Sequence, residues 1–400
     1  MIINPVIKGV VARSAHPIGC REAVKQQITY CQSAPQIHDG PKRALILGAS
    51  SGFGLASRIS LTFGGSRTKT LGVSFERGPS DKGVGSAGWY NNIYFKQEAE
   101  KNGLKAVNLI GDAFSPKMRE QVIRTIKEEF DGQVDLIIYS LASGVRPNLQ
   151  TGEFWHSAIK PIGNAINGLT LNLEHEELTE TSLSPASDQE VHDTIKVMGG
   201  EDWEEWITLL NNAGVLAEGC KTIAYSYIGP KSTYPIYHLG TLGQAKLDLH
   251  NKADLIHQKL QDIKGEAHVA VCKALVTKAS VFIPGFSPYL LALFKVMKTM
   301  GLHEGCIEQA QRLFNSKLYT TSGEAVIDEN RLIRLDDWEL RDDVQRAVTE
   351  LMANITPDNF KQLGDFDGYQ EDFLKLNGFG FDSIDYGQDI SMAFMESLKP

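Results

Sequence analysis

Apolar runs of strand length alternate with helical periodicity from Lys42 onward. Six runs are hydrophobic throughout, which is typical of parallel strands buried on both faces of a sheet. They are Ala44–Leu47, Thr70–Phe75, Ala106–Ile110, Leu136–Ser140, Thr222–Ser226 and Val269–Val276. This alternation predicts an α/β fold: a Rossmann-like, doubly wound parallel sheet flanked by helices. In such a fold, the ligand lies at the carboxyl ends of the strands.

The helix after the third run is the most clearly marked. Ser115 can cap its N-terminus, and Pro116 suits its first turn. Apolar residues then recur on one helical face: Met118, Val122, Ile123, Ile126 and Phe130. We therefore expect a helix from Pro116 that packs one face on the sheet.

Three segments outside the alternation are expected to be additions to the sheet. Residues 1–40 are predicted to form short strands and one helix, roughly Gly19–Gln32. The alternation lapses over 146–218, where the polar stretch Glu174–Glu190 is predicted to be an exposed loop or insertion. Residues 281–400 are mostly helical. Their apolar stripe fits either core packing or the wall of an apolar substrate pocket: Tyr289, Leu290, Leu293, Phe294, Met297 and Met300.

These segments predict a single large Rossmann-type domain over residues 1–400. Residues 42–145 and 219–280 would form the cofactor-binding core, and residues 1–40 would extend it at the N-terminus. Residues 146–218 and 281–400 would supply an insertion and C-terminal elements on the substrate side.

Composition narrows the class of protein. With 40 Lys and Arg against 49 Asp and Glu, the net charge is −9, which argues against nucleic acid or an anionic membrane as partner. No stretch approaches the ~18–20 apolar residues of a membrane helix, and the start lacks a secretion signal. The five cysteines are far apart without a CxxC pair, so neither a disulfide framework nor a metal site is expected. The expected location is cytoplasmic.

A glycine-rich turn carries the strongest functional signal. In ALILGASSGFGLAS, Gly48, Gly52 and Gly54 follow a strand and open a helix. Glycines there permit a tight turn and a close approach of the backbone to a pyrophosphate, and the helix start offers free N–H groups. The spacing is that of short-chain dehydrogenases rather than GxGxxG. The sequence therefore predicts a dinucleotide site here.

The same letters also fit G-x-S-x-G, the nucleophile elbow of α/β-hydrolases, centred on Ser50. That interpretation requires an acid and then a histidine after later strands. His250, His257 and His268 are available, but nothing marks any of them. It also leaves Gly54 unexplained, so the dinucleotide site is favoured.

The next strand ends in Phe75-Glu76, about 20 residues after Gly54, where an acid binding the adenosine ribose hydroxyls is expected. A carboxylate there repels a 2′-phosphate and so favours NAD over NADP. Arg77 weakens that inference, and a solvated strand-end glutamate is the alternative. Asp112-Ala113 and Ser140-Leu141 end the third and fourth strands, beside the expected course of the cofactor.

Four tyrosines precede a lysine that could complete a reduction site: Tyr225, Tyr227, Tyr234 and Tyr237, before Lys246. Dehydrogenases of this class pair a phenol, which donates to the oxygen gaining charge, with an ammonium that lowers the phenol pKa. Tyr237 is expected in a loop leading into the helix of Lys246. Their spacing departs from the usual Tyr-x3-Lys, so a packing Tyr and a surface Lys remain the alternative.

Two further motifs are interpreted as coincidences. Asn211–Gly214 spells the NNAG of short-chain dehydrogenases, but it ends a helical segment, Trp203–Leu210, instead of following the fourth strand. We expect a helix C-cap there. GFDSIDY around Ser383 is similar to the phosphopantetheine motif of carrier proteins, without a four-helix domain around it.

Taken together, the motifs resemble one family over essentially the whole chain. It is the single-chain enoyl reductase family of FabV-type enoyl-acyl-carrier-protein reductases and trans-2-enoyl-CoA reductases. The most specific elements are GASSGFGLASRI, TLGVSFERG, YSLAS and SYIGP…YPIY-x8-K.

The resemblance implies roles for individual residues. Tyr237 would be the proton donor, Lys246 would bind the cofactor, and Tyr227 would contact the substrate. The implied NADH contacts are Gly48, Ala49, Ser50, Ser51, Gly52, Phe53, Phe75, Glu76, Asp112, Ala113, Ser140, Leu141, Leu275, Val276 and Thr277. Two positions depart from the family pattern: Leu247 replaces a second lysine, and Gly144 replaces a proline after YSLAS.

The resemblance implies NADH-dependent reduction of the trans-2 double bond of an enoyl thioester in fatty acid biosynthesis. The acyl carrier would be either carrier protein or coenzyme A, and the chain is expected to be a monomer. Two alternatives remain at this point. One is a carbonyl or 3-hydroxyacyl dehydrogenase with the same cofactor geometry, and the other is a non-catalytic NAD-binding sensor.

Overall fold

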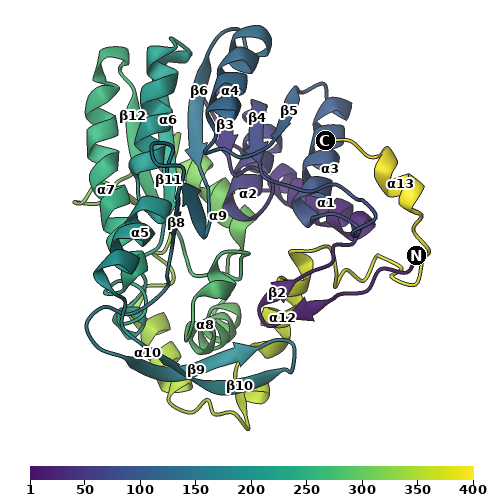
Figure 1. The fold of residues 1–400 in the computed structure, drawn as a ribbon, viewed down its shortest axis with the longest axis vertical. Coiled ribbons are helices and arrows are strands. Elements are labelled where there is room, and N and C mark those ends of the chain that lie inside the picture. The colour runs from purple at the N-terminus through teal and green to yellow at the C-terminus, as the bar shows by residue number, and fades with distance from the viewer.

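A seven-stranded parallel sheet forms the centre of the computed structural model, which describes residues 1–400 (Figure 1). The strands are β3 (Arg43–Leu47), β4 (Lys69–Ser74), β5 (Ala106–Ile110), β6 (Val134–Tyr139), β11 (Leu216–Ser226), β12 (Glu266–Val271) and β13 (Leu332–Arg334). Their order is β13-β12-β11-β6-β3-β4-β5. The winding reverses between β3 and β6, so the ligand crevice of a doubly wound sheet is expected at the carboxyl ends of these two strands.

Helices cover both faces of this sheet (Figure 1). On one side lie α1 (Pro17–Ser33), α2 (Gly52–Phe63), α3 (Ala87–Lys101) and α9 (Cys306–Arg312). On the other lie α4 (Pro116–Glu129), α6 (Glu201–Asn212) and α7 (Thr241–Lys259). The expected Rossmann-like α/β fold is therefore confirmed.

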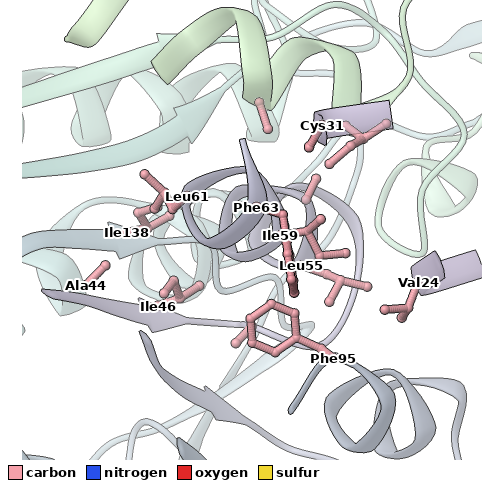
Figure 2. Close-up of a cluster of buried hydrophobic side chains, with 14 of the residues drawn as sticks. Val24, Cys31, Ala44, Ile46, Leu55, Ile59, Leu61, Phe63, Phe95 and Ile138 are labelled. Atoms are coloured by element: carbon pink, nitrogen blue, oxygen red, sulfur yellow. The ribbon is translucent and has the colours of Figure 1, made fainter. Parts of the chain in front are cut away.

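Successive side chains of β3 point to opposite faces of the sheet, and both faces are covered by apolar cores. Ala44 and Ile46 join the core under α2, where they meet residues such as Ile59 (Figure 2). Leu45 and Leu47 point to the opposite core under α4, α6 and α7. Because both faces are covered, Ala44 to Leu47 are all buried, and only Arg43 at the start of the strand is partly exposed.

A third apolar core joins the C-terminal helices to a β-hairpin. It contains α8 (Ser287–Thr299), α10 (Asp342–Met352), α11 (Phe360–Leu363), α12 (Phe366–Lys375), and parts of β9 (Ile166–Asn172) and β10 (Glu177–Leu183). Figure 1 shows the hairpin alongside α8 and α10. The apolar stripe of α8 is buried in this core, except for Met300, which is 41% exposed. Leu275 and Val276, from the loop after β12, belong to the same core.

Shorter elements complete the chain. They are the hairpin of β1 (Ile7–Lys8) and β2 (Val11–Ala12), the pair β7 (Val145–Pro147) and β8 (Phe154–His156), α5 (Asp188–Met198), α13 (Met392–Ser397), 3-10 turns at 231–233, 261–263 and 280–282, and a π-helical turn at 313–318. The Met1 amino group donates to the Ile390 carbonyl over 2.8 Å, so the first residue lies beside α13. No helix combines the length and apolarity needed to cross a bilayer.

Most predicted elements are confirmed, one strand end is wrong, and two regions contain elements that the sequence does not predict. The strand predicted over Val269–Val276 ends at Val271, because its neighbour β13 pairs with it only as far as Arg334. The stretch Glu174–Glu190 is not all loop, since it contains β10 and the start of α5. Strand β13 lies within the region expected to be mostly helical.

The two interpretations of helix ends are confirmed. The Ser115 hydroxyl accepts from the Met118 N–H over 3.2 Å and so caps α4. The NNAG sequence closes α6, with Ala213 as the C-cap and Gly214 at φ +67°. The motif therefore lies away from the carboxyl edge of β6.

Candidate active site

The glycine turn closes against the end of β6. Gly48 follows β3 with φ +88°, and a Cβ there would lie 2.3 Å from the Ser140 carbonyl oxygen. A Cβ at Gly54 would lie 2.0 Å from the Gly48 carbonyl oxygen. Both positions therefore exclude any side chain. Because α2 begins at Gly52, its unpaired N–H groups open at the crevice, an arrangement that fits a pyrophosphate.

Glu76 lies directly after β4 and is hydrogen-bonded to the glycine turn. The Ser50 hydroxyl donates to Glu76 Oε1 over 2.6 Å, and the Ser86 hydroxyl donates to Oε2. The glutamate is thus held at the strand end and is not freely solvated. Ser50 bonds to this carboxylate rather than to a histidine, so the nucleophile-elbow interpretation is wrong. Phe75 beside it is 81% exposed.

The other expected cofactor contacts follow the ends of β5, β6 and β12: Asp112, Ala113, Ser140, Leu141, Leu275, Val276 and Thr277. The Ser140 N–H donates to the Leu47 carbonyl over 2.8 Å, which fixes the end of β6 against β3. The loop after β12 is pinned by Ser280, whose hydroxyl donates to the Leu275 carbonyl over 2.6 Å. These residues therefore lie along the carboxyl edge of one sheet.

Tyr237 lies in the turn before α7, as the sequence predicts, and Lys246 lies within that helix. The Tyr237 side chain is 5% exposed, and its hydroxyl has no hydrogen-bond partner among the protein atoms. No hydrogen bond joins it to Lys246. The Tyr237 carbonyl accepts from the Gly243 N–H over 3.0 Å, so the tyrosine's backbone is fixed against the first turn of the helix that carries Lys246.

Tyr225 connects Lys246 to the glycine turn. The Lys246 ammonium donates to the Tyr225 carbonyl over 3.1 Å. The Tyr225 ring stacks on Phe53 with centroids 5.0 Å apart, and its hydroxyl is 2.5 Å from that of Ser57 in α2. The sequence singled out Tyr225 only as one tyrosine of four. Its position in space gives it this connecting role.

Burial shifts both ionisable groups of the pair. It lowers the pKa of Lys246 to about 8. It raises the pKa of Tyr237 above the ordinary value for a phenol. The sequence predicts that the ammonium lowers the phenol pKa, and this prediction is wrong for the structure, in which burial of the phenol raises its pKa. Tyr237 therefore keeps its hydrogen throughout the physiological range and can donate it.

Tyr227 packs against Tyr237 from the residue after β11. The two rings meet edge to face with centroids 4.8 Å apart, and Phe286 contacts the Tyr227 ring at 5.6 Å. The Tyr227 hydroxyl donates to Glu339 Oε1 over 2.9 Å. Sequence reasoning missed Glu339, because nothing in its local sequence distinguishes it from the acidic residues around it.

The two departures from the family pattern lie at the surface. Leu247 is 54% exposed on α7 beside Lys246, and Gly144 is exposed in the loop after β6. Neither contributes a side-chain hydrogen bond.

The glycine turn, the strand-end carboxylate and the Tyr and Lys beside them define a Rossmann-type, dinucleotide-dependent oxidoreductase. Family models match residues 83–319, described as the trans-2-enoyl-CoA reductase catalytic region, and residues 2–81, described as the NAD(P)H binding domain of trans-2-enoyl-CoA reductase. The chain belongs to this family of NADH-dependent enoyl reductases.

Similar proteins cover the whole chain. An enoyl-[acyl-carrier-protein] reductase [NADH] 2 of Photobacterium profundum is 61% identical over 398 residues, 100% of both chains. A trans-2-enoyl-CoA reductase [NADH] of Clostridium beijerinckii is 52% identical over 402 residues, again 100% of both. The crystal structure of Clostridium acetobutulicum trans-2-enoyl-CoA reductase in complex with NADH has a TM-score of 0.97, with 48% identity and 100% coverage of both chains.

A third family model, described as an enoyl reductase FAD binding domain, matches residues 327–390. The residues there do not fit a flavin dinucleotide. The segment after β13 carries three acidic residues, Asp336, Asp337 and Glu339, which offer no donor to a phosphate. Unlike β3, this strand is not followed by a glycine-rich turn that opens a helix. Helices α10 to α12 instead pack against α8 in the third core.

Proposed function

We infer that the protein reduces the trans-2 double bond of enoyl thioesters to give saturated acyl thioesters, with NADH as cofactor, in fatty acid biosynthesis. The observation that carries this inference is the buried Tyr237 hydroxyl without a protein partner, in the turn that leads into the helix of Lys246, a lysine that Tyr225 ties to the glycine turn. A phenol with an uncommitted hydrogen is what an oxygen gaining negative charge requires. The inference is supported by the full-length similarity to the NADH-dependent enoyl reductases.

Each site residue has its own role in the proposed reduction. When bound, NADH supplies a hydride to the β-carbon of the enoyl group. Negative charge then develops on the thioester oxygen, and Tyr237 stabilises it by donating a hydrogen bond, with Tyr227 also in contact with the substrate. Protonation at the α-carbon completes the saturation. Lys246, charged below about pH 8, would hold the nicotinamide ribose.

The proposed cofactor contacts lie along the carboxyl edge of the sheet. Gly48 to Phe53 would receive the pyrophosphate, and Phe75 and Glu76 would bind the adenosine half. Glu76, fixed by two serine hydroxyls, would accept from the ribose hydroxyls and repel a 2′-phosphate, so it favours NADH over NADPH. The loop from Leu275 to Thr277 would close over the nicotinamide.

The proposal also covers the acyl carrier of the substrate, the oligomeric state of the protein and its location in the cell. Relatives are named for carrier-protein and for coenzyme A thioesters, and either would present the same enoyl group. We propose a monomer in the cytoplasm, on the family resemblance and the composition, with the division into core and substrate-side segments given above.

The reaction is tested with NADH and crotonyl-CoA, longer enoyl-CoA and enoyl-carrier-protein substrates. We expect NADH oxidation with the enoyl thioesters, products two mass units heavier than the substrates (about 2 Da for the two added hydrogens), and weaker activity with NADPH. Acetoacetyl-CoA is the control for the carbonyl dehydrogenase alternative. Reduction of acetoacetyl-CoA alone would contradict the proposal. Tight NADH binding without turnover of any thioester would indicate the sensor.

The affinity for NADH is expected to fall as the pH rises through about 8. Burial lowers the pKa of Lys246 to about 8 from its ordinary value, so the ammonium is charged below this pH and neutral above it. If only the charged form binds well, the Kd rises about tenfold between pH 7 and pH 9. Fluorescence titration at several pH values measures it. Lys246→Met should bind weakly at every pH, and an unchanged pH slope in that variant would assign the effect elsewhere.

A further inference from the structure

A fully buried carboxylate lies behind the tyrosines of the candidate site. Glu339, five residues after β13, is 0% exposed. Its Oε1 accepts from the Tyr289 hydroxyl over 2.6 Å and from the Tyr227 hydroxyl over 2.9 Å. Its Oε2 accepts from the Ala274 N–H over 2.7 Å. One side chain therefore connects the end of β11, the loop after β12 and helix α8.

Burying a carboxylate in a largely apolar core is unfavourable unless donors satisfy it. Burial raises the pKa of Glu339, and the Tyr289 hydroxyl, the charge of Lys273 and the Ala274 N–H act in the opposite direction. Glu339 receives three donors, and Lys273 is itself 2% exposed. The Lys273 ammonium donates to the Ala274 carbonyl over 2.9 Å and lies 4.7 Å from the centroid of the Phe294 ring, without an ion pair. Glu339 is therefore a carboxylate that accepts three hydrogen bonds in the core. Packing alone would be satisfied by an apolar side chain at this position.

The number of hydrogens decides what each tyrosine can do. A phenol carries one hydrogen and accepts through its lone pairs. The Tyr227 hydrogen is committed to Glu339, so toward the site this hydroxyl presents only lone pairs. The Tyr237 hydroxyl, whose ring meets that of Tyr227 edge to face, is bonded to nothing in the protein. Of the two phenols, only Tyr237 has a hydrogen to give to a substrate.

We propose that Glu339 is a positioning residue: by accepting the Tyr227 hydrogen, it reserves donation to the substrate's carbonyl oxygen for Tyr237. The proposal rests on the proposed function, since it assigns the donor in that reaction. Glu339 itself touches neither substrate nor cofactor. It holds the Tyr227 ring against Tyr237 and, through Ala274, holds the loop that leads to Leu275–Thr277.

Glu339→Gln reverses the direction of one hydrogen bond. The amide oxygen can keep the Ala274 N–H, and the NH2 group then faces the two tyrosine oxygens and donates to them. The Tyr227 hydrogen becomes free to point into the site. In the otherwise wild-type protein, Tyr237 still donates, so Glu339→Gln should lower kcat less than Tyr237→Phe does.

The decisive test is rescue in the double variant. In Glu339→Gln/Tyr237→Phe, the freed Tyr227 hydroxyl should replace part of the lost donation, and kcat with crotonyl-CoA should exceed that of Tyr237→Phe by about tenfold. Adding Tyr227→Phe should remove the gain. A purely structural role for Glu339 would instead make the double variant no better than Tyr237→Phe.

Two controls separate the possible failures. Tyr289→Phe/Tyr237→Phe removes the other tyrosine on Oε1 without freeing Tyr227, so it should show no rescue. Thermal unfolding and NADH titration establish that each variant is folded and binds cofactor. If wild type and Tyr237→Phe behave as proposed while the double variant Glu339→Gln/Tyr237→Phe turns over no faster than Tyr237→Phe, only the role of Glu339 is overturned. A wild type that reduces no enoyl thioester overturns the proposed function itself.

Discussion

Replacing Tyr237 with phenylalanine is expected to lower kcat for enoyl-thioester reduction by about 10²–10³-fold, while NADH binds as in wild type. Removing one donor aimed at a developing oxyanion typically has this effect. Phenylalanine fills the same space against Tyr227 and Phe286, so the packing survives. The loss should therefore appear in kcat and leave the Kd for NADH nearly unchanged.

Single-turnover kinetics with crotonyl-CoA and fluorescence titration of NADH measure the two quantities separately. Tyr234→Phe is a matched control, because it makes the same chemical change in the same turn. The Tyr234 ring packs on His238 at 4.6 Å, outside the cluster of Tyr227 and Tyr237. Turnover of Tyr237→Phe at the wild-type rate would remove Tyr237 from the reaction.

Gly48→Ala is expected to weaken NADH binding by more than about 100-fold and to destabilise the fold. The added Cβ would lie 2.3 Å from the Ser140 carbonyl oxygen, and that atom is backbone at the end of a central strand. The φ of +88° adds strain of about 1–2 kcal/mol for any side chain. The turn must therefore open at the place where a pyrophosphate would lie.

Gly103→Ala is the control for backbone strain alone. Gly103 has φ +67°, and nothing lies within 4 Å of a Cβ added there. We expect it to lower the melting temperature modestly and to leave the Kd for NADH unchanged. Calorimetry and fluorescence titration give both values for each variant. Equal effects of the two substitutions on NADH affinity would contradict the role of the glycine turn.

Tyr237 and Lys246 illustrate why spacing alone was weak evidence for a reaction centre. Eight residues separate them in the sequence: residues 238–240 complete the turn before α7, and residues 241–245 form the start of that helix. A tyrosine in such a turn could point anywhere. Packing against Tyr227 and Phe286 directs its ring, and the Tyr225 carbonyl directs Lys246. The usual Tyr-x3-Lys spacing is therefore not required to bring the two groups to one edge.

The direction of the Tyr237 pKa shift also depends on tertiary structure. A lysine nearby in the sequence suggested that the phenol pKa would be lowered. The fold buries the phenol, and desolvation of the charged form raises the pKa instead. With a raised pKa, Tyr237 stays protonated. It can therefore donate a hydrogen bond during the reduction, and it would be a poor phenolate base.

Local patterns in the chain determined the sheet core, the glycine turn and most helix ends. The edge strand Ala106–Ile110 keeps its predicted bounds. The central run Ala44–Leu47 is buried at every position, because continuous apolarity is itself the consequence of burial on two faces. Ser115 and Gly214 mark helix ends through chemistry that acts within a few residues. The glycine turn is likewise specified by neighbours in sequence.

Tertiary structure alone decided the details that depend on distant partners. Strand β13 has three residues and forms only because β12 offers it an edge, and β12 ends at Val271, where its pairing with both β11 and β13 ends. Glu339 meets Tyr227 across a separation of 112 residues, and Ala274 across 65. No periodicity or spacing in the chain encodes such a meeting, because it depends on how three separately formed segments pack together.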